Sequence, residues 1–398
     1  MKLFSSLIYL TLWVSLSAQT PSAQNSTPLK NGSTKSVGMS TERLARIDTM
    51  AESAIADRDV PGLVALVARN GKIVYHKAFG VADAGTGREL KKDDIFRIFS
   101  QTKAITATAV MMLWEEGLFK LDDPISKWIP EFKNPQVLDT YNFTAGTYTT
   151  ISAKQEITIR HLLTHSSGVG YGAIDRDERI RLIYKEAGII EAVTQKHVLI
   201  ADNIKKLAKL PLHFHPGEKY TYSMGMDVLG CVIERASGQT FDVFLKERIF
   251  TPLGMSDTFF NLPKNKSDRF TNLYAFPGGI GRLIPGMANN LPKDKLMLLM
   301  DDRKTSPYLD PATVFDGGSG LVSSTEDYLK FAQMLLNGGK LGDARIISRK
   351  SVELFSRNHL GKEITGGEGF PEGMGFGITV GVTTDSGLRG QHGSDGSY

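Results

Sequence analysis

The spacing of apolar residues near the start of the chain predicts an amphipathic helix. The helix is expected to begin at Ser40, and its apolar side would consist of Leu44, Ile47, Met50 and Ile55. These positions recur at intervals of three to five residues, the period that places side chains on one face of an α-helix.

A different pattern follows and predicts a β-hairpin. Residues 63–67 and 72–79 are rich in β-branched and aromatic side chains. Asn70-Gly71 lies between them, and this dipeptide favours a tight hairpin turn because both positions adopt positive φ.

Helical patterns with recognisable ends recur along the middle of the chain. They cover residues 104–114 with Gly117 behind them, residues 157–164, residues 227–236 with Gly238 behind them, and a helix between a capping box at 323–326 and the glycines 338 and 339. Glycine directly after an apolar helical run is a common C-terminal signal, and Ser-x-x-Glu is a common N-terminal one.

Strand character returns only at residues 376–382, and residues 137–156 and 263–310 show no regular period. Strands near both ends with helices between them predict an α+β fold. In this fold an antiparallel sheet is built from both chain ends with flanking helices, and a mostly helical region of about residues 125–340 is inserted. We expect the two irregular segments to be long loops that border a binding site.

The N-terminal residues have the pattern of an exported protein. Lys2 precedes an apolar stretch at residues 3–16, which is followed by the small residues Ser17 and Ala18. Residues 1–18 are therefore predicted to be a secretory signal peptide, too short to remain as a membrane span. Residues 19–39 are rich in Ser, Thr, Asn, Pro and Gly and predict a flexible linker. Residues 40–398 are expected to form one domain with a periplasmic or secreted location.

Composition narrows the classes of function. The chain has 398 residues, 41% of them apolar, which is enough for a large core. The net charge of +4, without a basic run interleaved with aromatic residues, gives no support to nucleic-acid binding. Cys231 is the sole cysteine, which excludes an intrachain disulfide and a thiolate metal cluster.

A serine and a lysine at the start of the helix over residues 104–114 form the strongest chemical candidate. Ser100 is the only serine with a lysine three residues later, at Lys103. Residues i and i+3 share one helix face, so the amine can serve as the base that a serine nucleophile needs. A helix N-terminus also favours a developing anion. The alternative is a helix cap followed by a surface lysine.

Tyr222 is a second candidate, because it directly precedes the helix that starts near Asp227. A tyrosine hydroxyl can act as a general base when positive groups lie beside it. The alternative is a packed aromatic residue with no chemical role.

Two histidine pairs have the spacing of metal ligands, His161 with His165 and His213 with His215. The metalloprotease pattern needs Glu directly after the first histidine, and Leu162 occupies that position. Structural histidines are the better interpretation, and we expect no metal and no cofactor.

Two other catalytic motifs are absent from the sequence. No serine has glycine at both −2 and +2, the pattern of the α/β-hydrolase nucleophile, and no phosphate-binding glycine loop is present.

Together these residues resemble the serine β-lactamase and penicillin-binding-protein superfamily, with the closest likeness to class C β-lactamases and related esterases. The matching strings are FRIFSQTK at 96–103, LFKLDDP at 118–124, ITIRHLLTHSSG at 157–168, HPG at 215–217, YS at 222–223 and GGSGL at 317–321. The resemblance covers nearly all of residues 40–398. It implies a β-lactamase/transpeptidase-like fold and a serine hydrolase that works through an acyl-enzyme intermediate without a cofactor.

The resemblance also implies a role for each matching residue. Ser100 would be the acylated nucleophile, Lys103 its base partner and Tyr222 the second proton carrier. The third family motif, usually Lys-Thr-Gly, falls at Gln391-His392-Gly393, and the oxyanion hole would use the backbone N–H groups of Ser100 and Ser394. Gly393 would allow close approach of the substrate; a register with His392 in the lysine position loses that glycine.

Departures from the family pattern bear on the substrate. Met224 stands where the second motif has Asn, and Gln391 stands where the third motif has Lys. Esterase-like members often lack both polar groups, so a small ester is favoured over a β-lactam. A β-lactamase or D-amino-acid peptidase remains an alternative, and a catalytically weak binder of cell-wall peptides or β-lactams is another. The family continues beyond the third motif with two strands and a helix, so the chain is expected to be C-terminally incomplete.

Overall fold

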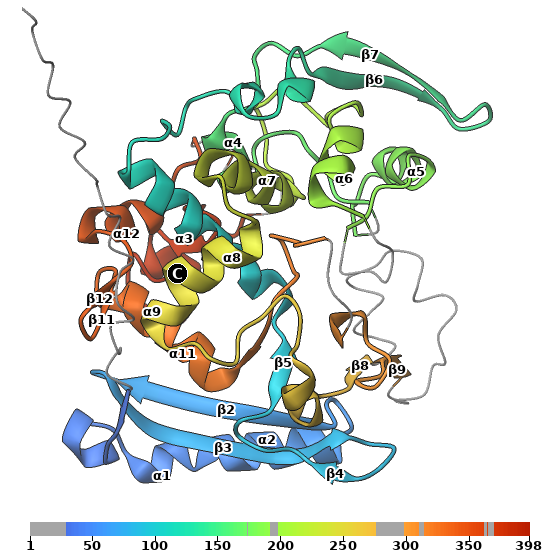
Figure 1. Cartoon of the computed structure of the whole chain (residues 1–398). Helices are drawn as coiled ribbons and strands as arrows, with labels where there is room; N and C mark the ends of the chain where they lie inside the picture. The colour runs from blue at the N-terminus through green and yellow to red at the C-terminus, as the bar shows by residue number, and fades with distance from the viewer. Residues whose placement is uncertain are drawn as a thin grey trace, which may run out of the picture.

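The computed structural model describes residues 29–172, 174–191, 198–275, 298–309, 314–361, 364 and 370–398. The predicted signal peptide, residues 1–18, lies outside the described residues. The main helices are α1 (Thr41–Leu44), α2 (Arg46–Ala56), α3 (Thr102–Glu115), α4 (Ile159–Leu163), α5 (Glu178–Glu186), α6 (Ile200–Leu207), α7 (Gly225–Ser237), α8 (Phe241–Leu245), α9 (Thr251–Leu253), α11 (Thr325–Leu336), α12 (Arg349–Phe355) and α14 (Ser386–Arg389). The strands are β1 (Lys30–Asn31), β2 (Gly62–Arg69), β3 (Lys72–Asp83), β4 (Arg88–Glu89), β5 (Ile95–Arg97), β6 (Gln136–Asn142), β7 (Thr147–Ser152), β8 (Leu273–Ala275), β9 (Leu298–Asp301), β10 (Val322–Ser324), β11 (Lys340–Leu341), β12 (Ala344–Arg345), β13 (Met374–Phe376) and β14 (Gly381–Thr383). Figure 1 shows their arrangement.

The predicted hairpin is confirmed as β2 and β3, which pair antiparallel with Leu63 opposite Phe79. Asn70 and Gly71 form its turn with φ of 51° and 69°, the positive values that this dipeptide favours. Helix α2 packs on one face of the hairpin, and α11 contacts it through β2. Figure 1 shows the hairpin between these helices at the lower end of the molecule.

The predicted N-terminal helix is confirmed with one difference in its buried side. Ser40 caps it by accepting a hydrogen bond from the Arg43 backbone N–H, and the helix is divided at Ala45 into α1 and α2. Met50, expected on the apolar side, is 57% exposed, and Ala51 is fully buried instead. A small side chain lets α2 lie close to the sheet.

The flexible-linker prediction is wrong for residues 30–37. Strand β1 pairs in parallel with β3. Ser33 then caps the short 3-10 helix η1, Thr34–Val37, in which Val37 is buried. Polar composition favoured a linker, but the exposed edge of β3 offers backbone hydrogen-bonding groups that such a segment can pair with.

Helix α3 runs through the centre of the molecule and is buried on nearly all sides. Thr106 and Thr108 lie inside, where their hydroxyls donate to backbone carbonyl oxygens. A helix that is buried all round belongs to the middle of a large core. The predicted end of this helix near Gly117 is confirmed, and Gly117 has a φ of 78°.

The other predicted helices are confirmed as α4, α7 and α11, and Gly238 closes α7 in the left-handed conformation. The cap of α11 lies one residue later than expected. Ser324, the last residue of β10, accepts from the Asp327 backbone N–H, and Ser323 lies inside the strand.

The expectation of an irregular loop over residues 137–156 is wrong. Strands β6 and β7 form a hairpin there, and it projects from the body of the molecule in both figures. Every residue of β7 is exposed, and in β6 only the adjacent residues Val137 and Leu138 are buried, so the hairpin has no continuous buried face to impose an alternating apolar pattern on the sequence. Within residues 263–310, β8 pairs with β9, and residues 276–297 lie outside the described part.

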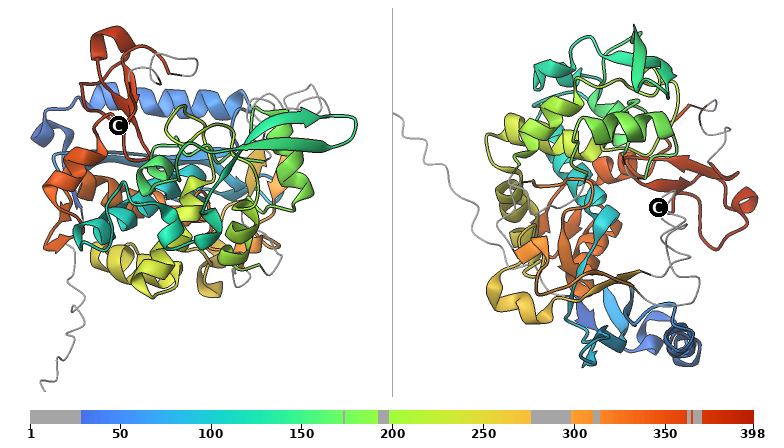
Figure 2. Two further views of the ribbon diagram at one scale, coloured as in Figure 1. Left: turned by 90° about the horizontal axis from the view of Figure 1, so that it is seen from above. Right: turned by 90° about the vertical axis from the view of Figure 1, so that its right-hand side faces the viewer.

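The α+β class and the β-lactamase/transpeptidase-like architecture are confirmed, and the strands near the C-terminus add a detail. Within the described residues, β13 and β14 pair with each other rather than with the β1-β3-β2 sheet. Figure 2 shows them projecting with α14 to one side of the body.

Candidate active site

Ser100 lies in a strained turn that leads into α3. The 3-10 helix η2, Phe99–Gln101, follows β5 directly, and β5 is held by antiparallel pairing with β10. Phe99 has a φ of 41°, a left-handed value that costs a bulky residue about 1–3 kcal/mol. The turn leaves Ser100 exposed at the N-terminal end of the buried helix.

The structure brings the three predicted reactive side chains together. Ser100 Oγ lies 2.6 Å from the Tyr222 hydroxyl oxygen. Lys103 Nζ lies 3.4 Å from Ser100 Oγ and 4.6 Å from the centre of the Tyr222 ring. Lys103 Nζ donates to Ser100 Oγ, and the Tyr222 hydroxyl oxygen is the acceptor within reach of the serine proton, the geometry required of a nucleophile with its base.

Lys103 is 3% exposed, and a glycine turn fixes its position. Its ammonium donates to the carbonyl oxygen of Gly318 at 2.8 Å, and Thr106 donates to the carbonyl oxygen of Gly317 at 2.7 Å. A β-carbon on Gly317 would lie 2.4 Å from the carbonyl oxygen of Met226, so only glycine allows this approach between the turn and α7. The string at 317–321 was matched as a family motif, but its contact with Lys103 was not predicted.

Aromatic rings hold Tyr222 on two sides. Tyr171 stacks on it with ring centres 5.7 Å apart and an angle of 10° between planes. The His165 ring lies 4.8 Å away and accepts a hydrogen bond at Nδ1 from the Ser223 backbone N–H. Burial, assisted by the nearby Lys103 charge, lowers the pKa of His165 to about 3, so the ring is neutral at ordinary pH. His165 and Tyr171 were not predicted as site residues.

The remaining predicted site residues lie elsewhere in the structure. Met224 is 1% exposed and belongs to the hydrophobic core. Gln391, His392, Gly393 and Ser394 are exposed on the C-terminal segment. That segment bonds to β14 through Gly396 N–H and Thr383 O. The Gln391 side chain accepts from Arg389 and the Ser394 N–H donates to Ser397.

No hydrogen bond joins these four C-terminal residues to Ser100, Lys103 or Tyr222 within the described part of the chain. Their roles in the oxyanion hole and in substrate binding therefore stay predictions.

The histidine pairs have structural partners. His161 Nδ1 accepts from the Thr158 backbone N–H in the cap of α4, and His213 Nε2 lies 2.8 Å from an Asp175 carboxylate oxygen. Across the described ranges, no group of three or more His, Cys, Asp or Glu side chains is arranged to hold a metal ion. No helix in those ranges has the length and hydropathy needed to cross a bilayer.

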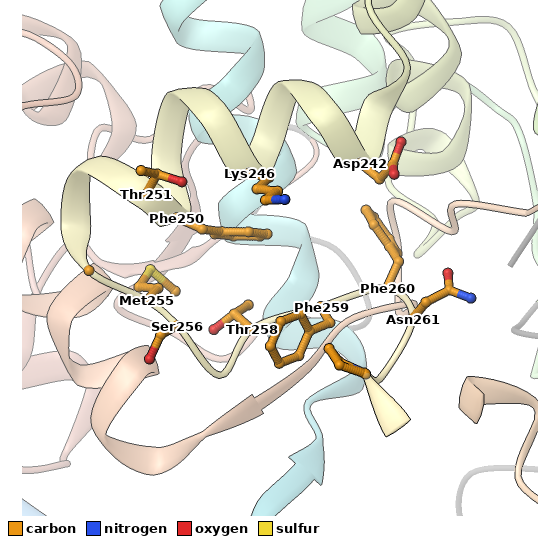
Figure 3. Close-up of a pocket in the computed structure, with 12 residues that line it drawn as sticks. Asp242, Lys246, Phe250, Thr251, Met255, Ser256, Thr258, Phe259, Phe260 and Asn261 are labelled. Carbon is orange, nitrogen blue, oxygen red and sulfur yellow. The ribbon is translucent and has the colours of Figure 1, made fainter. Parts of the chain in front are cut away.

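Two cavities differ in their relation to Ser100. One of about 400 Å³ adjoins the Ser100 turn and is lined in part by Ile98, Gln101 and Tyr328. The other, of about 530 Å³, lies between the helical segment 242–251 and residues 254–263 (Figure 3). None of the three reactive side chains lines either cavity, although the first is lined by Ile98 and Gln101 of the turn that carries Ser100.

The fold and the Ser-Lys-Tyr geometry define a serine hydrolase. The sequence matches the family model described as Beta-lactamase over residues 47–398, and the chain belongs to this family. Esterase EstB of Burkholderia gladioli is 32% identical over 349 residues, which cover 87% of this chain and 81% of that protein. Lovastatin esterase of Penicillium rubens is 28% identical over 80% of this chain and 73% of its own length.

Solved structures show the same fold. EstCE1, described as a hydrolase with promiscuous acyltransferase activity, matches with a TM-score of 0.69 at 25% identity over 89% of this chain and 86% of its own. The octameric penicillin-binding protein homologue of Pyrococcus abyssi matches with a TM-score of 0.60 at 24% identity over 86% of this chain and 65% of its own. The chain is therefore an esterase-like serine hydrolase of the beta-lactamase family.

Proposed function

We propose that this protein hydrolyses small carboxylic esters through an acyl-enzyme formed on Ser100. The observation that carries the proposal is the contact of Ser100 Oγ with both the Tyr222 hydroxyl and Lys103 Nζ, at 2.6 and 3.4 Å. Lys103 is buried in α3, and half-buried Tyr222, which lies just before α7, is held between the Tyr171 and His165 rings, so the arrangement is preorganised.

In the acylation step, the Ser100 hydroxyl loses its proton to the Lys103–Tyr222 pair while Oγ attacks the ester carbonyl carbon. The carbon–oxygen bond to the alcohol then breaks, and the same proton passes to the leaving oxygen. Water repeats the sequence on the acyl-enzyme: its proton goes to the pair, its oxygen attacks, and Ser100 regains a proton as the acid leaves. The Ser100 backbone N–H, with Ser394 as its proposed partner, would stabilise the oxyanion in both steps.

The absence of two polar side chains that the family usually has favours an ester substrate over a β-lactam. Met224 replaces the family's amide side chain and is buried in the core, and Gln391 replaces the family's lysine. Relatives that are named esterases support the same choice. A periplasmic or secreted location, inferred from residues 1–18, forms part of the proposal.

Covalent labelling with a fluorophosphonate probe tests the nucleophile. We expect the wild-type chain to be labelled and Ser100→Ala to be neither labelled nor active on p-nitrophenyl acetate, with an unchanged circular dichroism spectrum. Ser152→Ala, on the exposed β7 strand, is the matched serine control and should still be labelled. Turnover by Ser100→Ala would refute the assignment, and an unlabelled wild-type chain would favour a non-catalytic binding protein.

A further inference from the structure

Two buried carboxyl groups lie next to Lys103 and take no part in the proton transfers described above. Asp227 is in the first turn of α7, and Asp316 opens the turn that contains Gly318. They are 5% and 1% exposed. A β-carbon built on Gly318 would lie 3.0 Å from Asp227 Oδ2 and 3.2 Å from Asp316 Oδ1, so both carboxyl groups approach the same point.

The two groups differ in their hydrogen-bonding partners. Asp316 Oδ1 accepts from the N–H groups of Gly318 and Ser319 at 2.7 and 2.8 Å, and Oδ2 accepts from the Ser319 hydroxyl. Three donors stabilise the ionised carboxylate. Asp227 Oδ2 is completely buried and has no hydrogen-bond partner of ordinary geometry among the described residues, although the Gly318 backbone N–H lies close enough to lower the pKa of Asp227 slightly.

A buried carboxylate oxygen without a donor is strongly disfavoured, and two adjacent carboxylates repel each other. A proton on Asp227 removes both problems, because it neutralises one charge and can be donated to Asp316. In agreement with this, burial raises the pKa of Asp227 well above its usual range, and the Asp316 charge raises it further.

The positive charge of Lys103 explains why the carboxyl pair should carry a single negative charge. Its ammonium is buried, and no carboxylate lies within ion-pair distance of it among the described residues. A buried cation requires compensation, and Gly318 connects it to the carboxyl pair, because its carbonyl accepts from Lys103 while its N–H donates to Asp316.

We propose that Asp227 and Asp316 share one proton and form a positioning pair, whose single negative charge balances the Lys103 ammonium through the Gly318 turn. The ionisable groups that face the pair are Lys103 of α3, Tyr171 after α4 and Tyr308, which lies beside Asp316. A second negative charge would bind the proton of Lys103 too tightly for transfer. A neutral pair would leave the buried ammonium uncompensated. This inference rests on the proposed role of Lys103 in proton transfer.

Infrared spectroscopy tests the shared proton without reference to activity. At neutral pH the wild-type spectrum should contain the carbonyl stretch of a protonated carboxylic acid that is absent from Asp227→Asn. Asp268→Asn, whose side chain is fully exposed, is the matched control and should keep that band. A wild-type minus Asp227→Asn difference spectrum without the band would overturn the proposal.

The pH dependence of kcat/KM tests the effect on Lys103. Asp227→Asn keeps the hydrogen-bond donor and the net charge of the pair. The acid limb of the kcat/KM profile should therefore stay at the same pH as in the wild type. Asp316→Asn removes the negative charge, so the ammonium should lose its proton more readily and the limb should move to lower pH by about one unit. Asp227→Ala removes the donor and should react at least about tenfold more slowly than Asp227→Asn.

An equal shift of the acid limb in Asp227→Asn and Asp316→Asn would show that Asp227 carries charge and would overturn the proposal. If the variants change the melting temperature but not the pH of the acid limb of kcat/KM, the role of the pair is purely structural, and that result would also overturn the proposal. If Asp316→Asn does not fold, the infrared comparison decides. Failure of the proposed function is distinguishable, because labelling of Ser100→Ala would refute that function and leave the carboxylic-acid band unaffected.

Discussion

Lys103 donates a hydrogen bond to the carbonyl oxygen of Gly318 at 2.8 Å across 215 residues of sequence. The contact joins α3, which carries Lys103, to a turn from a distant part of the chain. It orients the ammonium between the Ser100 hydroxyl and the Tyr222 ring. Reactivity therefore depends on the turn as well as on the three side chains.

Removal of either proton carrier should slow the chemical step. We expect Lys103→Ala and Tyr222→Phe each to lower kcat for p-nitrophenyl acetate by on the order of 10²-fold or more, because each loses one member of the Lys103–Tyr222 pair that contacts Ser100 Oγ and relays its proton. Single-turnover kinetics measure the step directly. Tyr148→Phe, on the exposed β7 strand, is the control for loss of a tyrosine hydroxyl. A wild-type rate in either site variant would show that the substituted residue has only a structural role.

Substrate preference should follow the missing polar groups. Short-chain p-nitrophenyl esters should show a higher kcat/KM than a chromogenic cephalosporin. Met224 lacks the amide of the family's Asn, and Gln391 lacks the ammonium group of the family's Lys. A panel that includes a D-alanyl-D-alanine peptide ranks the three substrate classes. A cephalosporin or peptide that exceeds every ester would reverse the proposed ranking.

The glycine turn should tolerate no side chain at Gly317. In Gly317→Ala the new methyl group would lie 2.4 Å from the Met226 carbonyl oxygen, so the turn must shift away from α7. We expect a loss of about 1–3 kcal/mol in the free energy of unfolding together with lower kcat, since Gly318 moves with the turn.

Urea unfolding and steady-state kinetics measure these two effects. Gly361→Ala is the control, because a methyl group there meets no atom within 4 Å, and its stability should change by less than about 0.5 kcal/mol. Wild-type stability and rates in Gly317→Ala would show that the turn adapts without consequence.

Acid should destabilise the protein through His165. Its pKa is about 3 in the folded chain against 6.5 for the unperturbed group, because the ring is buried. The unfolded chain takes up a proton below pH 6.5 and the folded chain does not, so this contribution to stability is present above pH 6.5 and is lost as pH falls toward 3. The loss approaches about 1.4 kcal/mol per pH unit.

Urea unfolding at a series of pH values measures that slope. It should be smaller in His165→Asn, whose side-chain oxygen can still accept from Ser223, and unchanged in the exposed control His392→Asn. Equal slopes in all three proteins would contradict the assignment.

The sequence alone was sufficient for the features that depend on local chemistry. Asn70-Gly71 predicted its hairpin because few other dipeptides adopt two positive φ values. The apolar run after Ser100 predicted α3 because its length and composition favour a buried helix, and the Ser100–Lys103 spacing predicted their proximity because a helix sets the distance between i and i+3. The motif strings identified Tyr222 as the third member.

Tertiary structure decided what depends on contacts between distant segments. The exposed β6–β7 hairpin left no periodic apolar signal, and the pairing of β1 with β3 satisfied a strand edge that no local pattern reveals. The approach of Gly317 to Met226, and of Asp227 to Asp316, exists only because α3, α7 and the glycine turn pack together. The hydrogen-bond donors that this packing gives to Asp316 and not to Asp227 Oδ2, rather than residue type, favour the proton on Asp227.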